Sequence, residues 1–324
     1  MTEKNLDNMP AVTLDYIAQG HKAAIATVIE TWGSAPRPVG AQLAIRDDGT
    51  FQGSVSGGCV EGAVVAEAIE VLQTGECRVL EYGVSDEEVF AVGLACGGEI
   101  KILVEPVGLG QGPSVEMLQA LNNARSGRTP IGTQTNLATW DRKLITADDA
   151  PQRFTTDKSG VDDGIFTAVQ NPPLRLIVVG AVHIAQALLP MARIAGYDPY
   201  LIDPRDSFGS QARFPDQVIL NEWPDAAVET LGLDARTALV TLSHDPKLDS
   251  PALASALNSD AFYIGALGSK RTHAKRRAQL TKMGFTNTQI DRIHGPVGAN
   301  IGAATPSEIA ISVMAQITQT LRMS

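Results

Sequence analysis

Two cysteines lie in glycine-rich segments, where a thiol can meet a ligand. Cys59 directly follows Gly57 and Gly58 and precedes a segment with the apolar spacing of a helix, and Cys96 has glycines on its C-terminal side. Glycine permits close approach to the backbone, and a helix start stabilises a thiolate and a bound anion alike. We expect Cys59 and Cys96 to serve a soft metal or sulfur chemistry, although Glu61 opposes a thiolate locally. The alternative is that each is a small buried apolar residue.

The third cysteine, Cys77, lies at the start of an expected strand without neighbouring glycines other than Gly75. Three cysteines without a CxxC pair do not form a disulfide framework, which fits a reducing compartment. The polar beginning of the chain lacks the apolar core of a signal peptide, and no apolar run is long enough to span a membrane. These features predict a cytoplasmic protein with free thiols.

A second group of candidates follows four short apolar runs in the second half of the chain. In an open parallel sheet, ligands bind beyond the carboxyl ends of the strands. The four segments at these ends are Gly180-Ala181-Val182-His183, Asp203-Pro204-Arg205, Ser243-His244-Asp245 and Gly265-Ala266-Leu267-Gly268-Ser269. Together they predict a ligand cleft, against the alternative of an unoccupied scaffold. His183 and His244 could approach each other there, although a lone loop histidine is more often structural.

The first of these segments departs from the dinucleotide fingerprint G-x-G-x-x-G. Val182 stands where the second glycine lets the backbone approach a pyrophosphate, and a branched side chain there obstructs that approach. Asp203 has about the spacing of a ribose-binding carboxylate, but it can equally cap its own loop. Tight NAD(P) binding at Gly180 is therefore not expected.

The last segment leads into a basic helix. Lys270 and Arg271 lie in its first turn, where the helix dipole disfavours cations. A phosphate would relieve this conflict by meeting the free backbone amides together with Lys270 or Arg271, next to Gly268 and Ser269. The alternative is a solvated basic face.

The elements that position these residues form two groups. The first half shows expected strands and helices, a less regular stretch over 106–170 with a few threonine-rich strands, and a boundary at Asn171-Pro172-Pro173. The second half alternates short buried strands with helices, and a capping box from Thr305 to Glu308 begins the last helix. The expected strands are 23–30, 42–46, 50–53, 78–82, 99–105, 174–179, 200–202, 238–242 and 262–264, and the expected helices are 14–18, 60–74, 114–124, 184–195, 225–231, 251–257 and 270–283. We predict an α/β protein, with an α+β domain over 1–171 and a Rossmann-like doubly wound parallel sheet over 172–324.

Charge and missing motifs narrow the function classes. The 324 residues carry a formal net charge of −10, which repels nucleic acid and anionic membrane over most of the surface, so any anion site must be local. A soluble partner or small ligand is favoured. The sequence contains no nucleophile elbow, Walker lysine loop, HExxH or CxxC zinc pattern, so hydrolase, ATPase and zinc-enzyme functions lack support.

Several motifs in one order resemble the XdhC/CoxI family of xanthine dehydrogenase accessory proteins, over nearly the whole chain. These motifs are Gly33-Ser34-Ala35-Pro36-Arg37 with Gly40, Ser56-Gly57-Gly58-Cys59-Val60-Glu61 with Gly62, Gly93-Leu94-Ala95-Cys96-Gly97-Gly98, Ser243-His244-Asp245, Gly265-Ala266-Leu267-Gly268-Ser269 and Ile301-Gly302-Ala303-Ala304-Thr305-Pro306-Ser307-Glu308-Ile309-Ala310. The family usually has G-A-G-H where this chain has Val182 before His183, which puts nucleotide contact there in doubt. A tryptophan is common before the Cys96 motif, where this chain has Phe90.

The resemblance implies a non-enzymatic protein that binds molybdenum cofactor, in its mono- or dinucleotide form, protects it during sulfuration and inserts it into a xanthine dehydrogenase-type molybdenum hydroxylase. It implies a cofactor-associated N-terminal domain before the Rossmann-like one, a cysteine desulfurase as sulfur donor, and a homo-oligomer. Cofactor contacts are then expected from the glycine-flanked cysteine motifs, the basic turn and the carboxyl-edge loops. These residues are Arg37, Gly57, Gly58, Cys59, Glu61, Cys96, Gly97, Gly180, His183, Asp203, His244, Gly268, Ser269, Lys270 and Arg271, with Cys59 and Cys96 facing the metal. An NAD(P)-dependent oxidoreductase and a purely structural adaptor remain as alternatives.

Overall fold

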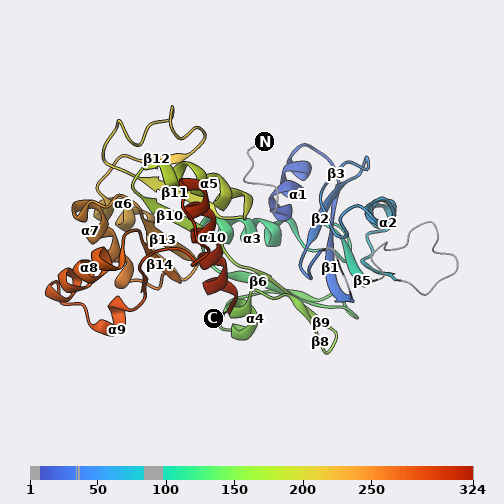
Figure 1. The fold of residues 1–324 in the computed structure, drawn as a ribbon. Coiled ribbons are helices and arrows are strands. Elements are labelled where there is room, and N and C mark those ends of the chain that lie inside the picture. Colours follow the sequence, from blue (N-terminus) through green and yellow to red (C-terminus); the bar gives the residue numbers. More distant parts are fainter. Residues whose placement is uncertain (1–7, 34, 36, 84–97, 324) are drawn as a thin grey trace. The chain divides into compact units, whose positions relative to one another are not determined.

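A computed structural model describes residues 8–33, 35, 37–83 and 98–323 of the chain (Figure 1). The chain divides into two compact units, Met1–Pro172 and Pro173–Ser324. The division falls one residue after the boundary expected from the sequence. Across the described residues, no helix is both long and apolar enough to cross a membrane.

The first unit contains an antiparallel sheet of five strands in the order β3-β2-β1-β5-β4. The strands are β1 (Ala23–Trp32), β2 (Gln42–Arg46), β3 (Phe51–Gly53), β4 (Arg78–Tyr82) and β5 (Glu99–Pro106). Helix α2 (Glu61–Thr74) covers one face, because its apolar stripe of Val64, Ala68 and Val71 is fully buried against the sheet. The helix ends at Gly75, whose left-handed φ of 74° closes the last turn.

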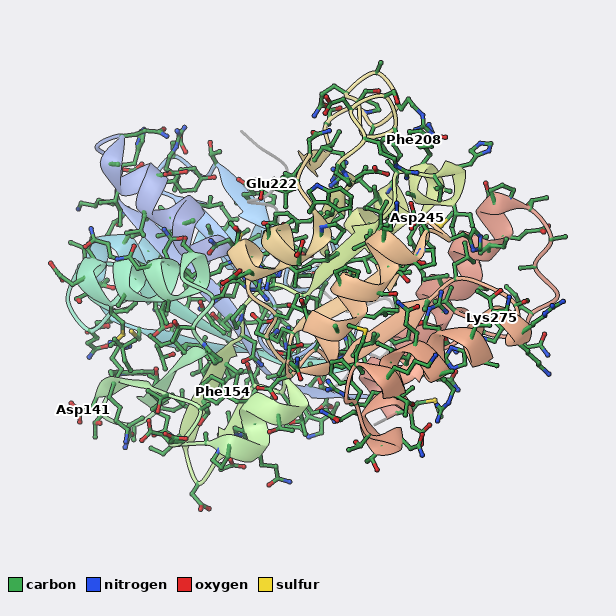
Figure 2. The ribbon with its side chains drawn as sticks, turned by 90° about the vertical axis from the view of Figure 1, so that its left-hand side faces the viewer. Asp141, Phe154, Phe208, Glu222, Asp245 and Lys275 are labelled. Atoms are coloured by element: carbon green, nitrogen blue, oxygen red, sulfur yellow. The ribbon has the colours of Figure 1, made fainter. Side chains whose placement is uncertain are left out.

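A second sheet occupies the segment that the sequence left less regular. Its four antiparallel strands lie in the order β7-β6-β9-β8. They are β6 (Ile131–Asn136), β7 (Arg142–Ile145), β8 (Gly160–Asp162) and β9 (Ile165–Gln170), and the accompanying helices are α1 (Met9–Ala18), α3 (Val115–Ser126) and α4 (Pro151–Thr156). Phe154 of α4 packs closely over Gly132, where a Cβ would lie 3.2 Å from the phenyl Cζ (Figure 2). Ile29 and Leu103 of the first sheet pack with Phe166 of β9, which joins the two sheets into one unit.

The second unit is built on six parallel strands in the order β12-β11-β10-β13-β14-β15. The strands are β10 (Arg175–Val179), β11 (Asp198–Ile202), β12 (Val218–Leu220), β13 (Thr237–Thr241), β14 (Tyr263–Ala266) and β15 (Ile293–His294). The helices are α5 (His183–Ile194), α6 (Pro224–Leu231), α7 (Pro246–Leu257), α8 (Lys270–Lys282), α9 (Asn287–Ile290) and α10 (Pro306–Met323). Separate cores lie on the two faces of the sheet, one with α5 and α10 and the other with α6, α7 and α8 (Figure 1). The doubly wound fold is confirmed.

Some element bounds differ from the prediction for local reasons. Helix α7 begins at Pro246 and not at Pro251, because Asp245 accepts a hydrogen bond from the Lys247 amide at 2.9 Å and caps the helix. The short edge strands β12 and β15 were missed. At the last helix, Glu308 accepts from the Thr305 amide at 2.8 Å, which confirms the predicted capping box.

Candidate functional site

The four segments predicted to form a cleft in the second unit do follow β10, β11, β13 and β14, and therefore lie at one edge of the sheet. The first and third are in close contact. A Cβ at Gly180 would lie 2.8 Å from the backbone nitrogen of Ser243, and Gly180 has a φ of 107° that favours glycine. Glycine is thus required here by the fold itself, whatever binds at the edge.

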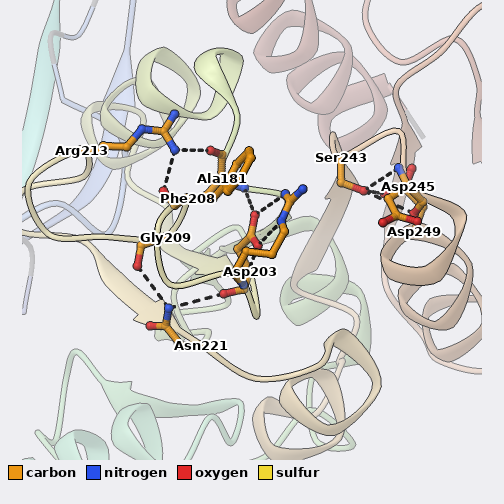
Figure 3. Close-up of polar contacts among 10 residues, drawn as sticks. Ala181, Asp203, Phe208, Gly209, Arg213, Asn221, Ser243, Asp245 and Asp249 are labelled. Carbon is orange, nitrogen blue, oxygen red and sulfur yellow. Dashed lines mark hydrogen bonds and ion pairs between the residues drawn. The ribbon is translucent and has the colours of Figure 1, made fainter.

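The carboxylate of Asp203 is fully buried, and neighbouring residues of the same unit occupy its oxygens (Figure 3). It accepts hydrogen bonds from the Ala181 amide at 2.7 Å and from the Arg205 amide at 3.0 Å, and it forms an ion pair with Arg205 at 2.7 Å. Burial acts to raise the pKa of Asp203, but these donors outweigh it and lower the pKa below its ordinary value. The structure therefore favours the loop-capping alternative over ribose binding.

The chain between β11 and β12 folds onto the first loop, and sequence analysis did not single it out. The guanidinium carbon of Arg205 lies 3.9 Å from the ring centroid of Phe208. Arg213 donates to the carbonyl of Ala181 at 2.9 Å and to that of Phe208 at 2.6 Å (Figure 3). This segment covers the first loop with a ring held between two cations.

A buried ion pair lies beneath the other two loops. Asp249 of α7 accepts from the Ser243 hydroxyl at 2.6 Å, and its second oxygen lies 3.5 Å from Nη2 of Arg276 on α8. Burial raises the pKa of Asp249 and lowers that of Arg276, while each opposes the shift of the other. Sequence analysis missed this pair as a site feature. The available signal was the position of Arg276 four residues before the buried Leu280, on the same face of the helix.

The remaining candidates in the second unit are exposed at the same edge. His183 begins α5, and His244 follows Ser243 with a positive φ of 61°. Lys270 and Arg271 project from the first turn of α8, whose N-cap Ser269 accepts from the Thr272 amide at 3.1 Å. No hydrogen bond between described residues joins the two histidines. The two histidines, which were expected to approach each other at this edge, are therefore not hydrogen-bonded to each other.

In the first unit, backbone amides of the loop that carries Cys59 donate hydrogen bonds to Glu61. The buried Glu61 carboxylate accepts from the amides of Val55 at 3.2 Å, Ser56 at 2.9 Å and Gly58 at 2.9 Å. Burial acts to raise the pKa of Glu61, but hydrogen bonds, led by those from Ser56, outweigh it and lower the pKa to about 2. The Cys59 side chain is exposed at the top of this loop.

This geometry corrects two expectations about the loop. The Cys59 and Val60 amides donate to the Ser56 hydroxyl at 3.0 Å and 2.9 Å, so the amides expected to meet an anion are occupied by Ser56 and Glu61. Glu61 therefore fixes the loop, and its buried carboxylate is not free for a cofactor. Helix α2 begins two residues after Cys59, so the thiol precedes the helix, in agreement with the helix expected over 60–74.

The other predicted residues of the first unit are less informative. Arg37 is partly buried, and its Nε has no hydrogen-bond partner among the described residues. Cys96 and Gly97 lie outside the described residues. Within the described part of the chain, no group of three or more His, Cys, Asp and Glu side chains is arranged to hold a metal ion. A cysteine-based metal contact thus rests on Cys59 alone in this structure.

Cys77 is different from Cys59. It is buried beside the ion pair of Arg142 and Glu105, with its sulfur 3.7 Å from Nη2 of Arg142. Burial, with the Glu105 charge, raises the pKa of the thiol to about 11. Cys77 is therefore an unreactive structural thiol.

Comparison with known proteins identifies the family of this chain. Residues 176–317 match the model of the XdhC Rossmann domain, and residues 16–83 match the model of the XdhC and CoxI family. Over 304 residues the chain is 31% identical to "Molybdenum cofactor insertion chaperone PaoD" of Escherichia coli K12, covering 94% of this chain and 85% of that protein. The chain belongs to the XdhC and CoxI family.

Further likenesses agree with XdhC and CoxI membership. The chain is 26% identical to a probable xanthine dehydrogenase subunit of Bacillus subtilis 168, over 92% of this chain and 93% of that one. It is 28% identical to the E. coli protein YqeB but spans only 43% of its length. The fold is shared with a crystal structure titled as a xanthine dehydrogenase from Bacillus halodurans, with a TM-score of 0.75, 24% identity and coverage of 97% and 96% of the two chains.

In this XdhC and CoxI family member, Val182 is the residue before α5. Its φ of −96° is one that any residue adopts, and its side chain packs on the core of α5 and α10. The position therefore does not require glycine for its backbone. Any effect of Val182 on nucleotides must come from its side chain.

Proposed function

We propose that this chain is a molybdenum cofactor chaperone that inserts the cofactor into a xanthine dehydrogenase-type molybdenum hydroxylase. One observation carries the proposal: the exposed Cys59 thiol is held on a loop that buried Glu61 fixes through three amides. A soft thiolate suits molybdenum and sulfur, and a preset loop lowers the entropic cost of holding the cargo. The 31% identical E. coli relative, a molybdenum cofactor insertion chaperone, supports the same role.

The finer parts of the proposal concern partners and location. The chain protects the cofactor during sulfuration, receives sulfur through a cysteine desulfurase, and self-associates in the cytoplasm without turning over a substrate. Cys59 and Cys96 face the metal, and the basic turn of α8 holds a phosphate of the cofactor. We propose no ligand contact for Asp203 or Glu61, because both carboxylates are already bound within the protein.

Purification from molybdenum-replete cells tests the proposal directly. The protein is expected to carry molybdenum and pterin in equal amounts, and to activate a cofactor-free client hydroxylase when the two are mixed. Metal analysis and pterin fluorescence measure the first, and client turnover measures the second. Protein that purifies without pterin and fails to bind added cofactor contradicts the proposal.

Nicotinamide dinucleotides are expected to bind weakly or not at all. The Asp203 carboxylate is occupied by Ala181 and Arg205, and Val182 stands where the dinucleotide fingerprint has the glycine that leaves the backbone open to a diphosphate. Calorimetry with NAD and NADP checks this. Val182→Gly should improve binding if the side chain is the obstacle. A dissociation constant in the low micromolar range for the parent protein would restore the oxidoreductase alternative.

Reversing the charges of Lys270 and Arg271 is expected to weaken cofactor retention at least about tenfold, because even one charge-assisted hydrogen bond to a phosphate is worth about 1.5–3 kcal/mol. Pterin content of the Lys270→Glu, Arg271→Glu double variant measures the effect. The matched control reverses Lys275 and Lys282, two exposed cations farther along the same helix. If the first pair retains pterin as the parent does while folded, the turn is only a solvated face.

A further inference from the structure

One nitrogen of the buried Arg276 guanidinium, Nη1, lacks an acceptor among the described residues. The residue is only 8% exposed, and its Nη2 donates to the Leu267 carbonyl at 3.0 Å and lies 3.5 Å from Asp249. Its Nη1 is buried and has no hydrogen-bond partner among the described residues. The Leu267 carbonyl and the Asp249 carboxylate thus both lie next to Nη2, and Nη1 is left without an acceptor.

The neighbouring carboxylate does not complete this site. One oxygen of Asp249 accepts from the Ser243 hydroxyl, and the other lies beyond close hydrogen-bond distance from Arg276. A buried guanidinium is costly unless its N–H groups are bonded, and an unpaired one in a native structure points to a missing acceptor. An anion supplies both an acceptor and the charge.

The guanidinium of Arg276 reaches the segment that leads into α8, because its Nη2 donates to the Leu267 carbonyl. Leu267 directly precedes the turn of Gly268 and Ser269, from which the 13-residue helix α8 starts. In that first turn, the described residues provide no acceptor for the amides of Lys270 and Arg271. Helix-start amides and a buried arginine are the two donor types that recognise phosphate.

We propose that Arg276 and the first turn of α8 form a phosphate subsite, in which the buried Asp249 carboxylate competes with the phosphate for the guanidinium. This inference rests on the proposed function, and it names the cofactor phosphate as the group bound. Nη1 is enclosed, so the turn at Gly268, with its φ of 142°, moves to admit the phosphate. The exposed Lys270 and Arg271 add attraction from outside, while Arg276 supplies the buried contact.

Calorimetry with inorganic phosphate tests the subsite on the full-length protein without cofactor. Asp249→Asn removes the competing negative charge, and is expected to tighten phosphate binding at least about tenfold. The variant's thermal midpoint should also become strongly phosphate-dependent, because phosphate replaces the lost partner of Arg276. If Asp249→Asn lowers the midpoint without tightening phosphate binding, the pair is structural only and the subsite is refuted.

Removing the arginine needs a variant that folds. Arg276→Met alone leaves Asp249 buried and unpaired, so the informative variant combines it with Asp249→Asn and buries no charge. This double variant is expected to bind phosphate about tenfold to a hundredfold more weakly than the parent. Lys275→Met is the matched control, an exposed cation on the same helix whose loss should leave binding unchanged (Figure 2). If Lys275→Met loses as much phosphate binding as the double variant, the effect comes from the net charge of the helix, and the subsite is refuted.

Two further measurements separate this inference from the proposed function. Cys59→Ser should bind inorganic phosphate as the parent does, because Cys59 has no part in the subsite. The double variant of Asp249 and Arg276 should also lose pterin on purification. If it loses phosphate binding but keeps pterin, the subsite does not hold the cofactor phosphate, and the assignment to the cofactor is wrong even if the chaperone role stands.

Discussion

Cys59→Ser protein is expected to fold as the parent does and to lose at least about tenfold in retained molybdenum and pterin, because losing even an outer-shell partner of a metal ligand typically costs about 10–100-fold in metal affinity. The exchange changes little volume, and the Cys59 side chain is exposed, so no core packing is removed. The Cys59 amide keeps its bond to Ser56 in the variant. Activation of a cofactor-free client hydroxylase should fall in parallel.

Cys77→Ser is the matched control for this experiment. Its thiol is buried with a pKa raised to about 11, so it takes no part in thiolate chemistry, and cofactor content should stay at the parent level. Both variants need a thermal midpoint beside their molybdenum and pterin content, because burying a serine hydroxyl at position 77 can lower stability. Full cofactor and full client activation in Cys59→Ser would show that the thiol is only a small surface residue.

The sequence predicted the second unit well because its strands are short apolar runs buried on both faces. Leu176 and Val240, for example, are fully buried in central parallel strands. The second sheet of the first unit could be predicted only as a few threonine-rich strands without bounds, because its strands are rich in threonine and glutamine and only partly buried. Their pattern lacks the apolar alternation that identifies a strand.

The position of the candidate site could be predicted from the sequence, but the burial and partners of its charged residues could not. Loops at the carboxyl edge follow from topology, so Gly180 and Ser243 could be placed together from the sequence. Whether a charged residue is a surface group or a buried partner depends on tertiary packing. For this reason Arg276 resembled its basic neighbours in the sequence, and Glu61 was taken for a charge opposing Cys59 when it binds the loop instead.

Glu61→Ala is expected to lower the free energy of unfolding by about 3 kcal/mol or more. The change leaves the buried amides of Val55 and Ser56 and the buried Ser56 hydroxyl without their acceptor, and each unsatisfied buried group costs about 1–3 kcal/mol. Denaturant unfolding measures the loss. Glu70→Gln on the same helix is the matched control, since Glu70 is largely exposed and, among the described residues, pairs with Arg78, and its effect should stay within about 0.5 kcal/mol.

The same carboxylate should make the stability of the protein depend on acid. The pKa of Glu61 is lowered from 4.5 to about 2 in the folded state, so the folded protein favours the charged form. Its contribution, about 3 kcal/mol, is complete above pH 4.5 and is lost as the pH falls through 2. In Glu61→Gln this component is absent, so the stability difference from the parent should shrink as the pH falls over that window. A difference that stays constant with pH would contradict the role assigned to the charge. Since this charge holds the loop under Cys59, Glu61→Gln should also retain less cofactor at neutral pH, whereas Glu70→Gln should not.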